Sequence, residues 1–124
     1  MLKKRVLIIE DDPGIQELIG YILESEGFEV IATSPNFSAD LSTQKADLIL
    51  LDEWVNKKEG HMLCKEIKQI HSFRHIPVII LSTAPDIADI AKNCKADGYL
   101  AKPFDIDDIV ALVNKVLGIK HVSA

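Results

Sequence analysis

The most constraining feature of this sequence is the alternation of short apolar runs with longer segments of helical period. Such alternation predicts βαβ units, and therefore a single α/β domain with a parallel sheet of five strands and five helices. Three runs are apolar at consecutive positions, which is typical of strands buried on both faces. We therefore expect the first, third and fourth runs at the centre of the sheet. The five runs are Val6–Ile9, Val30–Ala32, Leu48–Leu51, Val78–Leu81 and Tyr99–Ala101.

Two of the intervening segments carry clear helix boundary signals. Asp12 and Pro13 mark the start of the first helix, and Gly27 follows its end. Asp105 and Gly118 bracket the last helix in the same way. A further helix is expected along the apolar stripe Leu63, Ile67 and Ile70, and shorter, weaker helices are expected within residues 36–45 and 86–93.

Length, charge and cysteine content exclude several classes of protein. The 124 residues suit one domain, with residues 1–119 as the folded unit, residues 120–124 as a tail, and no room for an output domain. A net charge of −5 argues against binding nucleic acid through its phosphates, and no apolar run approaches the roughly 20 residues of a membrane helix. We expect a cytoplasmic protein with reduced Cys64 and Cys94 thiols. Its histidines, His61, His71, His75 and His121, are expected at the surface.

Polar residues close four of the five apolar runs. In an open parallel sheet, ligands bind beyond the carboxyl ends of the strands. If the first and third strands are neighbours, Glu10, Asp11 and Asp52 converge there. Because like charges repel at such distances, the cluster favours a bound cation, and its hard oxygen ligands suit Mg²⁺.

Ser82 and Lys102 close two further runs and would add a hydroxyl and an ammonium group to the cluster. A cation, an ammonium and a hydroxyl around one carboxylate suit phosphoryl transfer, with Asp52 as the nucleophile that forms an aspartyl phosphate. Each residue alone has an ordinary interpretation, since Asp12 before Pro13 is a common helix cap. Their joint occurrence at four strand ends favours the functional one.

At these positions the sequence resembles the receiver domain of two-component response regulators, from Lys4 to Leu117. The resemblance implies a flavodoxin-like doubly wound sheet of order 2-1-3-4-5. The matching stretches are Val6–Pro13, Ala46–Asp52, Pro77–Ser82 and Gly98–Phe104.

The resemblance also implies a phosphorelay role. Asp52 would accept a phosphoryl group from a sensor histidine kinase or a histidine phosphotransfer protein, and the domain would be a switch rather than an enzyme beyond its own phosphorylation and dephosphorylation. Phosphorylation would remodel the face of the fourth helix, fifth strand and fifth helix, which would also support a weak dimer. The downstream target is unknown. The implied site comprises Asp11 as direct Mg²⁺ ligand, Glu10 acting through water, the Trp54 backbone carbonyl, Ser82 beside the phosphoryl group, Tyr99 as aromatic switch, and Lys102.

Several positions depart from the family pattern. The segment after Asp52 lacks the usual proline, although Gly60 keeps its usual place, so this loop is expected to be less rigid. Thr83 replaces a smaller residue and is expected to slow phosphoryl transfer or restrict donors. The segment from Ser82 to Lys102 is short, which trims the fourth helix. Trp54 either packs beside the loop without a further role or shields the aspartyl phosphate from water.

Two other functions remain open. A magnesium-dependent phosphatase with an Asp nucleophile usually carries a second Asp two residues later, where this chain has Trp54. A receiver-like binding module with impaired phosphorylation is compatible with Thr83 and the missing proline, but not with the intact set of site residues.

Overall fold

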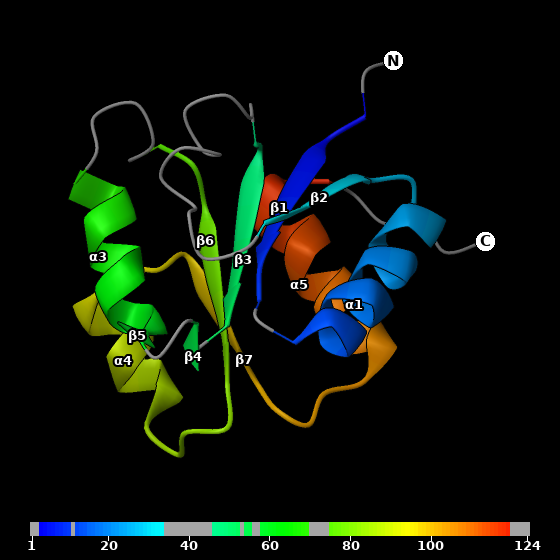
Figure 1. Cartoon of the computed structure of the whole chain (residues 1–124). Helices are drawn as coiled ribbons and strands as arrows, with labels where there is room; N and C mark the ends of the chain where they lie inside the picture. The colour runs from blue at the N-terminus through cyan, green and yellow to red at the C-terminus, as the bar shows by residue number, and fades with distance from the viewer. Residues whose placement is uncertain are drawn as a thin grey trace.

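The computed structural model describes residues 3–10, 12–33, 46–52, 54–55, 58–69 and 75–119. Its centre is a five-stranded sheet of order β2-β1-β3-β6-β7, in which all neighbours are parallel (Figure 1). This confirms the predicted fold class and strand order. The strands are β1 (Arg5–Ile9), β2 (Glu29–Thr33), β3 (Leu48–Asp52), β6 (Val78–Ser82) and β7 (Gly98–Ala101).

Helices cover both faces of the sheet. α1 (Pro13–Ser25) and α5 (Ile106–Leu117) pack on one face, and α3 (Gly60–Gln69) and α4 (Ile87–Asn93) on the other (Figure 1). Each face therefore has its own apolar core, one that includes Ile19 and Ile109 and one that includes Ile67. The described part of the chain contains these four helices, and the predicted helix within 36–45 lies outside it.

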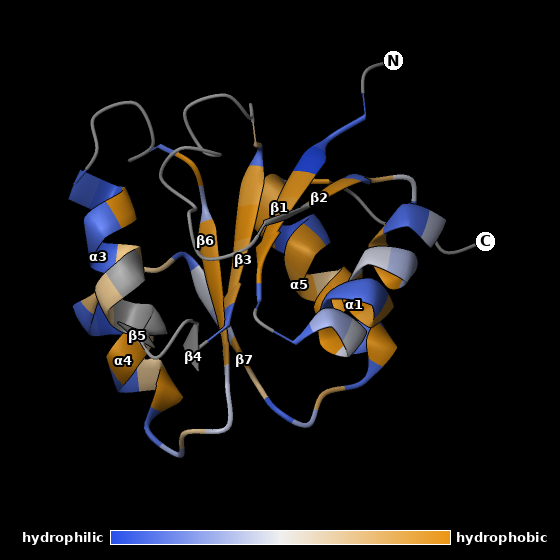
Figure 2. Ribbon diagram, viewed as in Figure 1, coloured by the Kyte–Doolittle hydropathy of each residue, from blue (hydrophilic) through white to orange (hydrophobic). Residues whose placement is uncertain are grey.

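The apolar runs occupy the positions predicted for them. β3 and β6 are buried along their whole length, and β1 is buried after its first residue, because each has neighbours on both sides and helices on both faces. Figure 2 shows that these central strands are mostly hydrophobic. β7, at one edge, alternates between half-buried and exposed residues. Consecutive apolar residues thus mark the central strands, as expected.

The predicted helix boundaries are also confirmed. The Asp12 carboxylate accepts hydrogen bonds from the backbone N–H groups of Gly14 (2.8 Å) and Ile15 (3.3 Å) at the start of α1. Gly118 ends α5 with a left-handed φ of 71°, which glycine adopts without strain. Asp105 starts α5, and its backbone N–H donates to Asp108 Oδ2 at 3.2 Å.

One element was not predicted from the sequence. β4 (Trp54–Val55) and β5 (Lys58–Glu59) pair antiparallel directly after β3, where the sequence predicted only a loop. Trp54 and Val55 are residues that favour strands, but two such residues are too short a run to predict one. This hairpin lies at the carboxyl end of the central strand β3.

Both cysteines are free and buried, in agreement with the prediction. The Cys64 thiol donates to the backbone carbonyl of Cys94 at 3.4 Å and thereby links α3 to the end of α4. The Cys94 side chain and burial raise the pKa of the Cys64 thiol well above its usual range. None of the helices in the described part of the chain combines the length and the apolar composition that crossing a bilayer requires.

Candidate functional site

Two acidic residues meet at the carboxyl ends of neighbouring strands. Asp52 is the last residue of β3, and Glu10 directly follows β1. β1 and β3 are hydrogen-bonded neighbours with Ile9 opposite Leu51, so the next residue on each chain lies at the same edge. Glu10 is 5% exposed and Asp52 is 8% exposed. The structure therefore brings together two buried carboxylates that were predicted to converge.

Lys102 supplies the positive charge of this cluster. It follows β7, and its backbone N–H donates to the carbonyl of Ser82 at 2.8 Å, which fixes it beside the end of β6. The Lys102 ammonium forms a hydrogen-bonded ion pair with Asp52 Oδ1. Both side chains are largely buried, so water screens this attraction weakly. The pair joins the fifth strand of the sheet to its central strand.

The two carboxylate oxygens of Glu10 differ in their hydrogen bonding. Its Oε1 accepts from the backbone N–H of Asp12 at 3.3 Å, while its buried Oε2 has no hydrogen bond to any residue that the structure describes. Burial, and next the charge of Asp52, raise the pKa of Glu10 to about 7, with Lys102 acting in the opposite direction. The ionised form of Glu10 is therefore costly unless a cation lies beside it.

Ser82 and Thr83 close β6 at the same edge but differ in exposure. Ser82 is buried, and its Oγ accepts from the backbone N–H of Ala84 at 2.9 Å. Thr83 is exposed. Tyr99 lies on β7 opposite Ile80 and is 45% exposed, so its ring is at the surface rather than in the acidic cluster.

The structure describes the remaining predicted residues only in part. Asp11 lies outside the described residues. The backbone of Trp54 belongs to β4, two residues after Asp52, but its side chain is outside the described part. Among the histidines, His75 is exposed as predicted, and the side chains of the other three fall outside the description.

The described donors suit a hard divalent cation. Glu10 and Asp52 provide carboxylate oxygens, and the unpaired, buried Glu10 Oε2 is an atom that a cation would satisfy. Within the described residues, no group of three or more His, Cys, Asp or Glu side chains forms a complete metal site. A site with two carboxylates and further positions for water and phosphate is typical of Mg²⁺.

One residue that positions the site was not predicted from the sequence. The Gln16 side chain on α1 donates from Nε2 to the backbone carbonyl of Glu10 at 2.7 Å. This contact ties the residue after β1 to the first turns of α1. No pattern in the sequence could have identified Gln16, because a glutamine on a helix is ordinarily a surface residue.

Comparison with known proteins identifies the family. Residues 6–114 match the model of the response regulator receiver domain. The chain is 34% identical over 117 residues to the DNA-binding dual master transcriptional regulator RpaA of Synechocystis, which covers 91% of this chain and 48% of that protein. It is 31% identical over 120 residues to the phosphate regulon regulator PhoB of Escherichia coli, a match that covers 94% of this chain and 52% of that protein. The chain thus spans about half the length of these relatives.

Solved structures agree with this assignment. A putative response regulator from Chloroflexus aurantiacus superposes with a TM-score of 0.86 at 26% identity, covering 94% of this chain and 99% of that chain. The receiver domain of a sensor histidine kinase from Pseudomonas aeruginosa, solved with magnesium in its active site cleft, superposes with a TM-score of 0.81 at 26% identity. This match covers 94% of this chain and 99% of that chain. Receiver domains are signalling switches that bind Mg²⁺ and take phosphoryl groups from histidine kinases. This chain belongs to the family of two-component response regulator receiver domains.

Proposed function

We propose that Asp52 is the phospho-acceptor of this receiver domain. The observation that carries the proposal is the ion pair of Asp52 with Lys102, buried beside Glu10 where β1, β3 and β7 end. A carboxylate held by a buried ammonium is fixed in position to act as a nucleophile. A lone aspartate in a turn would need neither partner.

The proposed transfer involves Asp52, Lys102 and Ser82. An oxygen of the Asp52 carboxylate attacks the phosphorus of a phosphohistidine on a kinase or phosphotransfer protein. The new P–O bond forms as the P–N bond breaks, and the imidazole leaves with the electron pair of that bond. The Lys102 ammonium and the Ser82 hydroxyl donate hydrogen bonds to phosphoryl oxygens and so stabilise the charge on the group in transit.

Glu10, Asp11, Asp52 and the backbone carbonyl of Trp54 are the residues proposed to hold Mg²⁺, with Glu10 acting through water. When bound, the cation neutralises charge on the phosphoryl oxygens and between the clustered carboxylates. The support from this chain is the unpaired Glu10 Oε2 described above.

The proposed output is a change at the surface formed by α4, β7 and α5. Ser82 would move toward the phosphoryl group, and the exposed Tyr99 would follow it inward, shifting the population between two conformations. α4 has only seven residues, as the short segment before Lys102 predicted, so this surface is small. We propose residues 1–119 as the receiver unit and a cytoplasmic location; the relatives that extend beyond such a unit leave the downstream partner open.

The acceptor is tested with a small phosphoryl donor. Incubation with acetyl phosphate and MgCl₂ should add one phosphoryl group per chain by intact-mass spectrometry, and EDTA should prevent it. Asp52→Asn should abolish the addition, whereas Asp89→Asn, at an exposed position on α4, should leave it unchanged. Phosphorylation of the Asp52→Asn protein would overturn the proposal.

The same assay separates the two other functions. A magnesium-dependent phosphatase would release inorganic phosphate from monoesters over many turnovers. If the chain is instead a receiver-like binding module, the wild-type protein should gain no phosphoryl group, even with Mg²⁺ and excess donor.

We further propose that Thr83 and Trp54 set the rates of this chemistry. Thr83→Ala should speed phosphorylation, because the smaller side chain leaves more room for the donor. Trp54→Ala should speed loss of the phosphoryl group if the indole shields it from water. Both rates follow from timed mass spectra, and unchanged rates would contradict the two roles separately.

A further inference from the structure

A groove lies between the end of α3 and the end of α4, and it has no role in the proposed phosphorylation. We call it the α3–α4 groove, and its volume is about 330 Å³. It is lined by the last turns of α3 and by the residues that end and follow α4. The lining residues are Lys65, Lys68, Gln69, Asn93, Cys94 and Lys95, so they include three lysines and no acid.

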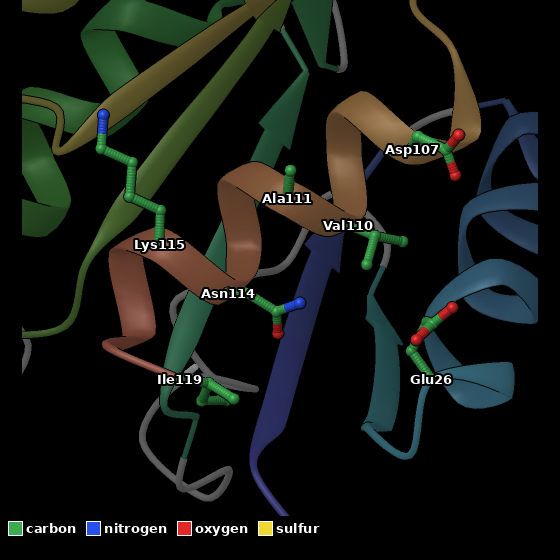
Figure 3. Close-up of a pocket in the computed structure, with 7 residues that line it drawn as sticks. All are labelled: Glu26, Asp107, Val110, Ala111, Asn114, Lys115 and Ile119. Atoms are coloured by element: carbon green, nitrogen blue, oxygen red, sulfur yellow. The ribbon is translucent and has the colours of Figure 1, made fainter. Parts of the chain in front are cut away.

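This lining contrasts with the rest of the chain, whose net charge is −5. The groove between α1 and α5 is lined by two acids and a single lysine, and Figure 3 shows the Lys115 side chain pointing away from Glu26 and Asp107. A groove on the surface of α1 has Glu17 and Glu24 in its lining and no base. The α3–α4 groove therefore has the opposite charge and favours an anionic ligand.

One of its three ammonium groups is held in place by the protein. Lys68 Nζ donates to the carbonyl of Ile76 at 2.9 Å and to Asp97 Oδ2 at 2.7 Å, and its side chain is only 14% exposed. Asp97 also accepts from the backbone N–H of Val78, the first residue of β6. These contacts place Lys68 at the edge where the strands begin, opposite the acidic cluster. Because an ammonium donates three hydrogen bonds, one donor of Lys68 is left for a ligand.

The other two ammonium groups have no carboxylate beside them. Lys65 and Lys95 are exposed and form no ion pair within the ranges that the structure describes. Since Asp97 balances Lys68, these two lysines leave two positive charges uncompensated. The two amide side chains of the lining add uncharged N–H donors. A phosphate dianion matches this charge, and its oxygens accept hydrogen bonds from ammonium and amide groups alike.

Helix ends explain only part of this pattern. A base near the C-terminus of a helix is favourable to its dipole, and Lys68 lies in the last turn of α3. Lys95 instead follows α4, where the carbonyls of Ala91 and Lys92 already accept from the backbone N–H groups of Ala96 and Lys95. Its φ of 62° is a left-handed conformation that glycine adopts at lower free energy. A ligand that requires the ammonium accounts for a lysine at this strained position.

We propose that the α3–α4 groove binds a small phosphorylated anion, with Lys65, Lys68 and Lys95 around its phosphoryl group. The volume of the groove is at the lower end of the roughly 300 to 1,000 Å³ of small-molecule sites, which suits a phosphate or a small phosphate ester. The bound anion would join α3 to the residue after α4. Because the groove requires no phosphoryl group on Asp52, the proposal is independent of the proposed function.

NMR titration of the isotope-labelled chain with inorganic phosphate tests the site, in Mg²⁺-free buffer whose ionic strength is kept constant with NaCl. The backbone amide signals of Lys65, Gln69 and Lys95 should shift saturably. Lys65→Ala and Lys95→Gly should each raise the dissociation constant about tenfold, because each removes one charge-assisted hydrogen bond. Glycerol phosphate distinguishes two sources of the phosphoryl group. Tighter binding than phosphate assigns the groove to an ester, and equal affinity assigns it to phosphate itself; either result supports the site.

Lys115→Ala is the matched control, because it also removes one exposed lysine from a groove, and it should leave phosphate binding unchanged. Lys95→Gly separates binding from folding, since it should bind phosphate more weakly while its free energy of unfolding rises. Equal dissociation constants for the wild type and all three variants would show non-specific attraction and overturn the proposal. A wild-type chain without saturable shifts at the groove would overturn it as well.

Discussion

Lys102 brings a positive charge to the buried carboxylates of the site. Lys102→Ala would remove the ammonium that pairs with the buried Asp52 carboxylate, so the free energy of unfolding should fall by about 2 kcal/mol in Mg²⁺-free buffer. MgCl₂ should recover part of this loss, because a cation then takes over the compensation. Urea denaturation with and without MgCl₂ measures both effects.

The matched control is Lys92→Ala, which removes an exposed lysine of α4 and should not respond to Mg²⁺. An equal loss of stability for Lys102→Ala in both buffers would mean that the ammonium acts through packing rather than through its charge. The phosphorylation rate of Lys102→Ala should fall in parallel.

Asp97 accepts two hydrogen bonds that join neighbouring elements at the opposite end of the sheet. Its Oδ2 accepts from the backbone N–H of Val78 at 2.8 Å and from the Lys68 ammonium at 2.7 Å, which ties β6, β7 and α3 together. Asp97→Ala should cost about 1 kcal/mol, because it leaves the Val78 N–H, at the start of a buried strand, without its acceptor. Thermal or urea unfolding measures this loss.

Asp97→Asn separates the two contacts. Its amide oxygen still accepts from Val78 but forms no ion pair with Lys68, and exposed ion pairs contribute little. The Asn variant should therefore keep most of the stability. A loss as large as that of Asp97→Ala would show that the ion pair is the dominant contact.

Helix ends offer a test at the level of whole elements. Lys95 follows α4 with a left-handed φ of 62°, and its backbone N–H donates to the carbonyl of Lys92 at 3.2 Å. Because a side chain strains this conformation, Lys95→Gly should raise the free energy of unfolding by about 1 kcal/mol. Gly118→Ala should lower it by a similar amount, since Gly118 ends α5 in the same conformation.

These two changes are measured together by urea denaturation. Opposite signs are expected because the backbone conformation is the same and only the residue type is exchanged. If Lys95→Gly lowered stability, contacts of the Lys95 side chain would outweigh the backbone strain.

Elements with a strong local signal could be predicted from the sequence, and those that depend on tertiary contacts could not. The central strands follow from consecutive apolar residues, and α5 follows from its stripe between Asp105 and Gly118. The β4–β5 hairpin has only two residues in each strand, so its pairing leaves almost no periodic trace. The contact of Gln16 with the Glu10 carbonyl likewise depends on where α1 docks.

For the whole molecule, strand order decided how much of the site could be predicted. Glu10 and Asp52 are far apart in the sequence and meet only because β1 and β3 are neighbours. From the sequence alone we could say only that Glu10 and Asp52 meet if β1 and β3 are neighbours. The family resemblance supplied the strand order in which they are. The buried state of Glu10 and its unpaired Oε2 could not be predicted, because they depend on the packing of every element around the site.

Because the buried Glu10 Oε2 has no partner among the described residues, we expect the stability of the whole molecule to rise with Mg²⁺. A cation that binds only the folded chain stabilises it by mass action, by about 2.7 kcal/mol at one hundred times its dissociation constant. Wild-type protein should therefore unfold at rising urea concentrations as MgCl₂ is increased, with an equal ionic strength of NaCl as the control. Glu10→Gln and Asp52→Asn should each reduce the dependence, because each removes one carboxylate from the site. An Mg²⁺ response that both variants retain would place the cation elsewhere on the molecule and leave the unpaired Glu10 oxygen without a function.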